Sequence, residues 1–390
     1  MNVTRLDVGF IPLVDAAPLI CCSEMGFARE EGLDLRLRAY PSWSSLRDGL
    51  CFGQLDAAHM LAAVPVASAL GLGGTAAQLH ALAVLSVNGN VIGVSRDLAR
   101  KIEAQGHDFA FDDARAAGQA LIAAKGDGLR VGVPFPFSMH AELVYYWLSA
   151  LGLPAPQKLI VRTVPPPQMA DALEAGELDA FCVGEPWGSR SVEAGVGKLL
   201  LPCSEIWSFA PEKVLAVRAG WTDTHPNEAH RLTRALWRAA RWLGTQDTAS
   251  LVPEILSRPH YLDLSPDLLE HALTGQFTIS AEGEARHAKS FVAFFQGAAN
   301  FPWRSQAEWI GSQLAKRTGL DPVESAHAAR ATFRSDVYRA ALDGIAPDLP
   351  SASVKLEGAL AEASAAGSLG GRLILDRNVF FDGRIFEPIQ

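Results

Sequence analysis

The sequence predicts an α/β protein of two similar lobes with a ligand cleft between them. At 390 residues the chain is too long for one compact core and about right for two or three units of ordinary domain size. Residues 46–57 and 169–180 share one pattern, in which an amphipathic helix ends at a glycine and a short strand opens with Leu-Asp-Ala. Because one α/β unit occurs twice, and paired lobes usually hold a small ligand between them, the repeat favours a binding protein with a hinge.

Strands and helices alternate through the first part of the chain. The expected strands cover residues 6–13, 33–39 and 55–60, and the expected helices cover residues 16–30 and 44–53. Such alternation with short turns implies a parallel sheet with helices on its faces. A further strand is expected over residues 81–95, and it contains the polar group Asn88, Gly89 and Asn90. The charged, alanine-rich residues 96–128 that follow are expected to be helical.

A second alternating series begins near residue 130. Strands are expected over residues 130–133, 158–164 and 178–183, with helices over residues 140–151 and 167–175. The strand expected at 214–217 returns to the first lobe, and residues 250–390 are expected to be mainly helical and irregular. The first lobe is therefore predicted to be discontinuous, formed by residues 1–94 and 214–390, whereas residues 95–213 form the second lobe.

Composition argues against several classes of function. The net charge of −9 disfavours direct binding to nucleic acid, which requires a clustered excess of Lys and Arg. No apolar stretch reaches the roughly 18 to 20 residues of a membrane helix, and the chain enters its first strand without an export signal. The cysteines are odd in number and lack the paired spacing of a metal site, as expected for buried thiols in a reducing compartment; they are Cys21, Cys22, Cys51, Cys182 and Cys203. These features predict a cytoplasmic protein that does not associate with membranes.

Several sequence blocks, in the right order along most of the chain, resemble the solute-binding proteins of the nitrate and bicarbonate ABC transporters. The blocks are Tyr40-Pro-Ser-Trp-Ser-Ser-Leu-Arg-Asp48, Asp56-Ala-Ala-His-Met-Leu61, Asn88-Gly-Asn90, Pro165-Pro-Pro-Gln-Met169, Phe181-Cys-Val-Gly-Glu-Pro-Trp187, Pro211-Glu-Lys213 and Phe380-Phe-Asp-Gly-Arg384. The resemblance implies a two-lobed fold like that of the type II periplasmic binding proteins.

Within that family, the missing export signal is similar to the cytoplasmic nitrate/nitrite sensors of the NasS type. The resemblance implies that such a protein holds an RNA-binding antiterminator partner of the NasT type inactive and releases it when nitrate or nitrite binds. An alternative is the nitrate-binding component of an ABC transporter. A third reading is a store of oxyanions, which has no protein partner.

The resemblance also implies where an anion binds. Six positions match the anion-contacting positions of the family, namely Trp43, Asn88, Gly89, Asn90, His140 and Lys213. Nitrate only accepts hydrogen bonds, so Lys213 is expected to supply the charge, His140 and Asn90 the directed hydrogen bonds, and Trp43 a ring face or an indole N–H. Gly89 lets a backbone N–H approach closely.

Two positions bear on which anion binds. Asn90 stands where nitrate binders of the family generally carry glutamine, so the pocket is expected to be reshaped or bridged by water. Lys213 stands where the bicarbonate binders carry glutamate, an acceptor for the bicarbonate hydroxyl. A lysine therefore favours nitrate or nitrite, without a metal or other cofactor.

Each of these residues also fits a purely structural role. Without the resemblance, packing is the better reading for Trp43, a helix cap for His140 and a surface position for Lys213. The additional pocket-lining candidates are His59, Pro136, Glu185 and Trp187. Among them His59 also fits a core histidine on a buried strand, and residues 184–187 also fit a rigid turn.

Enzymatic function has little support in the sequence. The chain lacks the Gly-x-Ser-x-Gly, P-loop, Gly-x-Gly-x-x-Gly and His-Glu-x-x-His motifs. His140 and Cys182 are a conceivable nucleophilic pair, but Cys182 falls in the middle of a buried strand, where a thiol is not activated. The sequence therefore predicts a binding protein and not an enzyme.

Overall fold

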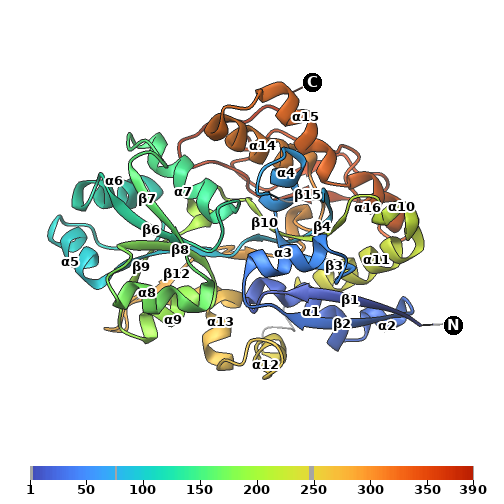
Figure 1. Cartoon of the computed structure of the whole chain (residues 1–390), viewed down its shortest axis with the longest axis horizontal. Coiled ribbons are helices and arrows are strands. Elements are labelled where there is room, and N and C mark those ends of the chain that lie inside the picture. The colour runs from blue at the N-terminus through green and yellow to red at the C-terminus, as the bar shows by residue number, and fades with distance from the viewer. Residues whose placement is uncertain (1–2, 75–76, 246–249, 390) are drawn as a thin grey trace.

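The computed structural model describes residues 3–74, 77–245 and 250–389. It contains two mixed β-sheets in two lobes that lie side by side (Figure 1), which is the predicted fold class. The first sheet has the order β13-β4-β10-β3-β1-β2, with β1 Thr4–Phe10, β2 Leu33–Ala39, β3 Ala57–Leu61, β4 Leu79–Asn88, β10 Pro211–Arg218 and β13 Val292–Ala293. The second has the order β7-β6-β8-β5-β9, with β5 Asn90–Ser95, β6 Leu129–Val133, β7 Leu159–Thr163, β8 Ala180–Gly184 and β9 Gly197–Pro202.

Helices cover both sheets. Those of the first lobe are α1 Ala17–Glu24, α2 Phe27–Glu30, α3 Trp43–Cys51, α4 Ala63–Ala69, α10 Trp221–Thr224 and α11 Pro226–Leu243. Those of the second lobe are α5 Arg96–Ala104, α6 Ala114–Ala124, α7 Met139–Ala150, α8 Met169–Glu174 and α9 Trp187–Glu193. In the described part of the chain, none of the helices has the length and apolar character needed to cross a bilayer.

The sequence repeat forms the same helix–turn–strand connection in both lobes. After α3 and α8 the chain turns at Gly53 and Gly176, both with positive φ, and enters the buried strands β3 and β8. The aspartate before each strand ties it to the neighbouring parallel strand. Asp56 accepts the backbone N–H of Asp7 at 2.8 Å, and Asp179 accepts the backbone N–H of Arg130 at 2.9 Å. In each lobe the aspartate side chain thus replaces one backbone hydrogen bond at the start of the strand pair.

The chain passes between the lobes at Gly89, which has φ 101° and separates β4 from β5. The sequence predicts this crossing at residues 94 and 95, within a single strand over residues 81–95. The structure places it earlier because the Asn88 amide holds the return segment, accepting from Ala210 N and donating to Ser208 O. Consequently β5 belongs to the second sheet, and the chain re-enters the first sheet at Pro211 instead of residue 214.

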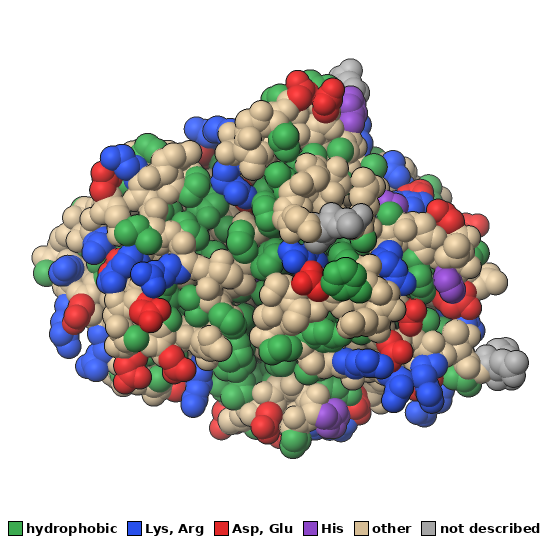
Figure 2. Space-filling view, in the orientation of Figure 1, with side chains coloured by type: hydrophobic (Ala, Val, Ile, Leu, Met, Phe, Trp, Pro, Cys, Tyr) green, Lys and Arg blue, Asp and Glu red, His purple; other side chains and the backbone are tan. Residues whose placement is uncertain are grey.

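The C-terminal third wraps around the first lobe and reaches the second. Its helices are α12 Leu251–Leu256, α13 Pro266–Thr274, α14 Arg304–Thr318, α15 Pro322–Thr332 and α16 Ser335–Leu342, and its small strands are β11 Gln276–Thr278, β12 Ala285–His287, β14 Ser364–Ala366 and β15 Leu373–Leu375. The ring of Trp207 lies 4.7 Å from Trp309 and 4.8 Å from Phe380, centroid to centroid. On the face in Figure 2, hydrophobic side chains gather along the boundary between the lobes.

Candidate site: a buried ionic cluster between the lobes

Lys213 is the centre of the candidate site. It lies on β10 and is fully buried, although a lone lysine before a strand is usually a surface residue. Its Nζ is 2.7 Å from Asp15 Oδ2 and 2.9 Å from Glu212 Oε1. Asp15 comes from η1, the 3₁₀ turn Val14–Ala16 that follows β1. The ammonium therefore sits between two buried carboxylates.

Two histidines extend the cluster and connect it to the second lobe. His59 on β3 places Nε2 3.0 Å from Asp15 Oδ1. His140, the second residue of α7, places Nδ1 3.2 Å from Glu212 Oε1. Both rings are fully buried. Since α7 covers the second sheet and β3 and β10 belong to the first, the cluster contains groups from both lobes.

Trp43 and Asn90 complete the surroundings of Lys213. The Nζ of Lys213 lies 5.6 Å from the Trp43 ring centroid, within cation–π range. Asn90 opens β5 and pairs with Gly184 of β8. A Cβ built on Gly184 would lie 3.5 Å from Asn90 Oδ1 and 3.7 Å from Asp15 Oδ2, so Gly184 packs directly beside both side chains.

Several buried polar atoms around Lys213 have no hydrogen-bond partner among the residues that the structure describes. They are Trp43 Nε1, His59 Nδ1, Ser86 Oγ, His140 Nε2 and, apart from an approach to Glu212, the Asn90 amide. An unsatisfied buried donor or acceptor costs about 1–3 kcal/mol, so such groups are rare in native cores. Their concentration around one buried ammonium is typical of a site for a small polar ligand that accepts hydrogen bonds.

The charges of the cluster follow from burial and from Lys213. Burial raises the pKa of the Asp15 carboxyl, but the nearby Lys213 and His59 outweigh it and hold that pKa at about 2. Burial raises the pKa of Glu212 to about 7 against the opposing effect of Lys213. Burial lowers the pKa of His140 well below its usual value, and Lys213 lowers it further. At neutral pH the histidines are neutral, Asp15 is ionised and Glu212 is near its midpoint.

The remaining predicted residues have other surroundings. Asn88 uses both amide atoms on the return segment, and Gly89 forms the crossing. Pro136 is exposed. The Glu185 carboxylate accepts the backbone N–H of Ser189 at 3.2 Å, within its own turn. Trp187 donates its indole N–H to Pro12 O at 3.0 Å, a contact between the lobes.

Sequence reasoning missed three members of the cluster, Asp15, Ser86 and Glu212. Asp15 is a single acid within the apolar stretch 8–22, and Glu212 directly precedes Lys213. An isolated charge in an apolar stretch is a signal for a paired or functional group, because such a residue is almost never buried alone. Ser86, on a strand that reads as wholly apolar core, carried no such signal.

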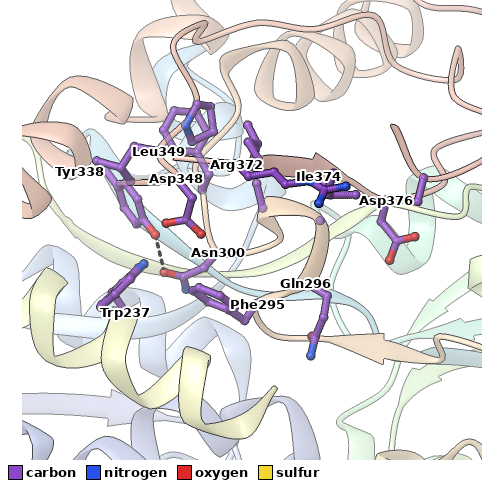
Figure 3. Close-up of a pocket in the computed structure, with 16 residues that line it drawn as sticks. Trp237, Phe295, Gln296, Asn300, Tyr338, Asp348, Leu349, Arg372, Ile374 and Asp376 are labelled. Atoms are coloured by element: carbon purple, nitrogen blue, oxygen red, sulfur yellow. Dashed lines mark hydrogen bonds between the residues drawn. The ribbon is translucent and has the colours of Figure 1, made fainter. Parts of the chain in front are cut away.

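The pocket in Figure 3 is a separate feature. This cavity of about 420 Å³ lies between α11, α16 and the C-terminal segment. Its walls include the aromatic side chains of Trp237, Phe295 and Tyr338, with Asp348 and Arg372 also contributing. Tyr338 already donates its hydroxyl to Asn300 at 2.9 Å. Broad aromatic walls suit a larger apolar ligand better than an anion of three or four heavy atoms.

The family model of the NMT1-like family matches residues 1–257. The chain belongs to this family. It is 29% identical to the nitrate/nitrite binding protein NrtA of Nostoc and 30% identical to that of Synechococcus elongatus, covering 84% of each. It is also 33% identical to the nitrate import ATP-binding protein NrtC of Synechocystis, of which it spans 46%.

Solved structures agree with this membership. The periplasmic nitrate-binding protein NrtA from Synechocystis PCC 6803 superposes with a TM-score of 0.83 at 26% identity, covering 99% of this chain and 96% of that one. The alkanesulfonate-binding protein SsuA from Xanthomonas axonopodis shares the fold alone, at 15% identity and a TM-score of 0.58. The predicted type II periplasmic-binding-protein fold is confirmed, as is the prediction of a binding protein and not an enzyme.

Proposed function

We propose that this protein binds nitrate or nitrite in the buried cluster around Lys213 and closes its two lobes over the anion. The observation that carries the proposal is the set of unpartnered buried groups from both lobes around one ammonium. Trp43 Nε1 and His140 Nε2 are donors when they carry their protons, and Asn90 offers an amide N–H. The similarity to NrtA, a nitrate/nitrite binding protein, supports the same ligand class.

The arrangement favours nitrate or nitrite over bicarbonate. Both nitrogen oxyanions only accept hydrogen bonds, whereas bicarbonate also carries a hydroxyl that needs a free acceptor. The nearby carboxylates, Asp15 and Glu212, are already engaged by Lys213. A bicarbonate hydroxyl would therefore compete with the ammonium for these oxygens.

Contacts between the lobes give closure a physical basis. Besides the contact of Trp187 with Pro12, Val14 N donates to Glu185 O at 2.9 Å. In the first turn of α7, the buried Glu142 accepts a hydrogen bond from Arg317 of α14 at 2.6 Å. An anion that contacts groups on both sides stabilises the closed arrangement by the difference between its affinities for the closed and open states.

Isothermal titration with nitrate, nitrite and bicarbonate tests this proposal. Trp43→Phe keeps an aromatic ring and removes one donor, so we expect it to weaken nitrate binding about tenfold, in line with about 1–1.5 kcal/mol for one hydrogen bond. Trp221→Phe is the matched control. The Trp221 Nε1 is likewise buried without a partner in the described chain, but it lies on α10, outside the cluster. Equal affinities for both variants would contradict the assignment.

The role that follows binding has two candidates. In the first, supported by the similarity to NrtA, the protein is the solute-binding component of a nitrate transporter. In the second, it is a cytoplasmic sensor whose closed form releases an antiterminator partner of the NasT type. Pull-down of a NasT-type protein with and without nitrate separates them: nitrate-dependent release supports the sensor, and absence of any complex contradicts it.

A further inference from the structure

The buried cluster has no surplus positive charge before an anion arrives. One ammonium, on Lys213, faces two carboxylates, and all three groups are inaccessible to water. The remaining titratable neighbours are two imidazoles and a thiol pair, Cys182 and Cys203, whose sulfurs lie 3.5 Å apart. Burial holds the pKa of Cys182 well above its usual value, so that thiol stays neutral.

An added anion therefore makes the cluster more negative unless a proton comes with it. Uncompensated charge in a dry site is strongly unfavourable, because neither water nor a counterion screens it. Lys213 cannot supply further positive charge, since it is already protonated. The compensating proton must go to one of the groups that face the anion.

The compensating proton is expected to bind at the contact between Glu212 and His140. Glu212 Oε1 lies 3.2 Å from His140 Nδ1 without the alignment of a hydrogen bond, and both ring nitrogens of His140 are buried without a hydrogen-bond partner within the described ranges. A proton on Glu212 donates to Nδ1 and fixes the tautomer in which Nε2 carries its hydrogen. That N–H then points away from the carboxyl and is free to donate to an anion. The same proton on the imidazole leaves the pair with the same total charge.

We propose that the Glu212–His140 pair takes up one proton with each nitrate or nitrite ion, and that Glu212 is a positioning residue that sets the His140 donor. The proposal rests on the proposed function and adds its regulation by pH. Because burial brings the pKa of Glu212 to about 7, the uptake falls in the physiological range. Below that pH the proton is already present, and above it the proton must be acquired on binding.

The test is calorimetry of nitrate binding between pH 6 and 9 in two buffers of different ionisation enthalpy. We expect nearly one proton taken up per nitrate at pH 8.5, little at pH 6, and affinity that falls about tenfold per pH unit above pH 7. Glu212→Gln keeps the side-chain size, and its amide N–H can donate to Nδ1. In this variant we expect the proton uptake and the pH dependence to disappear.

Glu142→Gln is the matched control, because Glu142 is also buried with a pKa raised to about 7 by burial, but it pairs with Arg317 and with no group of the cluster. It should retain the proton uptake even if its affinity changes. Wild-type binding with pH-independent affinity and no proton uptake overturns this inference and leaves the proposed function standing. Loss of uptake in Glu142→Gln overturns the assignment to Glu212. No nitrate binding at any pH overturns the proposed function itself.

Discussion

Two lysines of this protein each lie between two carboxylates, and their surroundings differ. Lys198 on β9 donates to Glu103 at 2.8 Å and Glu284 at 3.0 Å, and both glutamate side chains are about 40% exposed. Lys213 on β10 lies equally close to Asp15 and Glu212, which are buried. Around Lys198 the ionic contacts are hydrogen-bonded and face water, whereas several groups around Lys213 have no partner in the described residues.

The difference separates a structural ion triad from the proposed binding site. At the edge of the second lobe, water and well-formed hydrogen bonds satisfy Lys198 and its partners, so the triad joins the β11–β12 hairpin to α5 and needs nothing else. In the interior between the lobes, the same charge pattern leaves donors unsatisfied. Such an arrangement is expensive in a core that serves only packing, and it is expected where a ligand completes it.

The largest effect is expected when Lys213 is removed from its triad with Asp15 and Glu212. Lys213→Met leaves two carboxylates buried without their cation, so we expect the free energy of unfolding to fall by about 3–5 kcal/mol and nitrate binding to be lost. Urea denaturation and calorimetry measure the two effects. Lys198→Met, the same substitution in the triad whose carboxylates are about 40% exposed, should cost only about 1 kcal/mol or less and retain binding. Similar losses of stability in both variants would remove the distinction between the triads.

A second prediction concerns stability as a function of pH. The pKa of Glu212 is about 7 in the folded protein, above the value of about 4.3 in an unfolded chain. The folded state therefore binds the proton more tightly. The contribution of Glu212 to the free energy of unfolding is complete below about pH 4 and is lost as the pH rises toward 7. Glu212→Gln should reduce the fall in stability between pH 5 and pH 8 by about 3 kcal/mol. Urea denaturation of both proteins at these two pH values measures it, and an unchanged pH dependence would refute the prediction.

A third and smaller effect tests the link between closure and affinity. Arg317→Met breaks the contact with Glu142 across the lobes and should weaken nitrate binding several-fold by favouring the open state. Arg330→Met is its control, because Arg330 pairs with the buried Glu308 at 2.6 Å within the C-terminal region. Both variants should lose stability, but only Arg317→Met should lose affinity in calorimetry. Equal affinities would mean that this contact does not bias closure.

The two-lobed fold could be predicted because the residues of the repeat have local structural roles that do not depend on distant contacts. Gly53 and Gly176 supply the positive φ that ends each helix, and Asp56 and Asp179 tie the strands that follow. The crossing between the lobes was misplaced because residues 81–95 read as one apolar strand. Only the contacts of the Asn88 amide with a segment 120 residues away define the break at Gly89.

The site was predicted only in part. Trp43, His140 and Lys213 were found through their resemblance to family positions, and the structure brings them into one buried region. Asp15 and Glu212 were missed because the burial of a carboxylate depends on a partner distant in sequence, as Lys213 is from Asp15. Asn88 is a ligand candidate from the sequence, and in the structure both atoms of its amide bind the backbone of Ser208 and Ala210.

A crystal structure of the protein grown with nitrate tests the central claim most directly. The account predicts the anion between the lobes, within hydrogen-bond distance of Lys213 Nζ, Trp43 Nε1 and His140 Nε2. At least one of the ion-pair contacts of Lys213 with Asp15 or Glu212 should be lengthened. An anion bound elsewhere, with the Lys213 triad unchanged and calorimetry still reporting tight binding, would contradict the account.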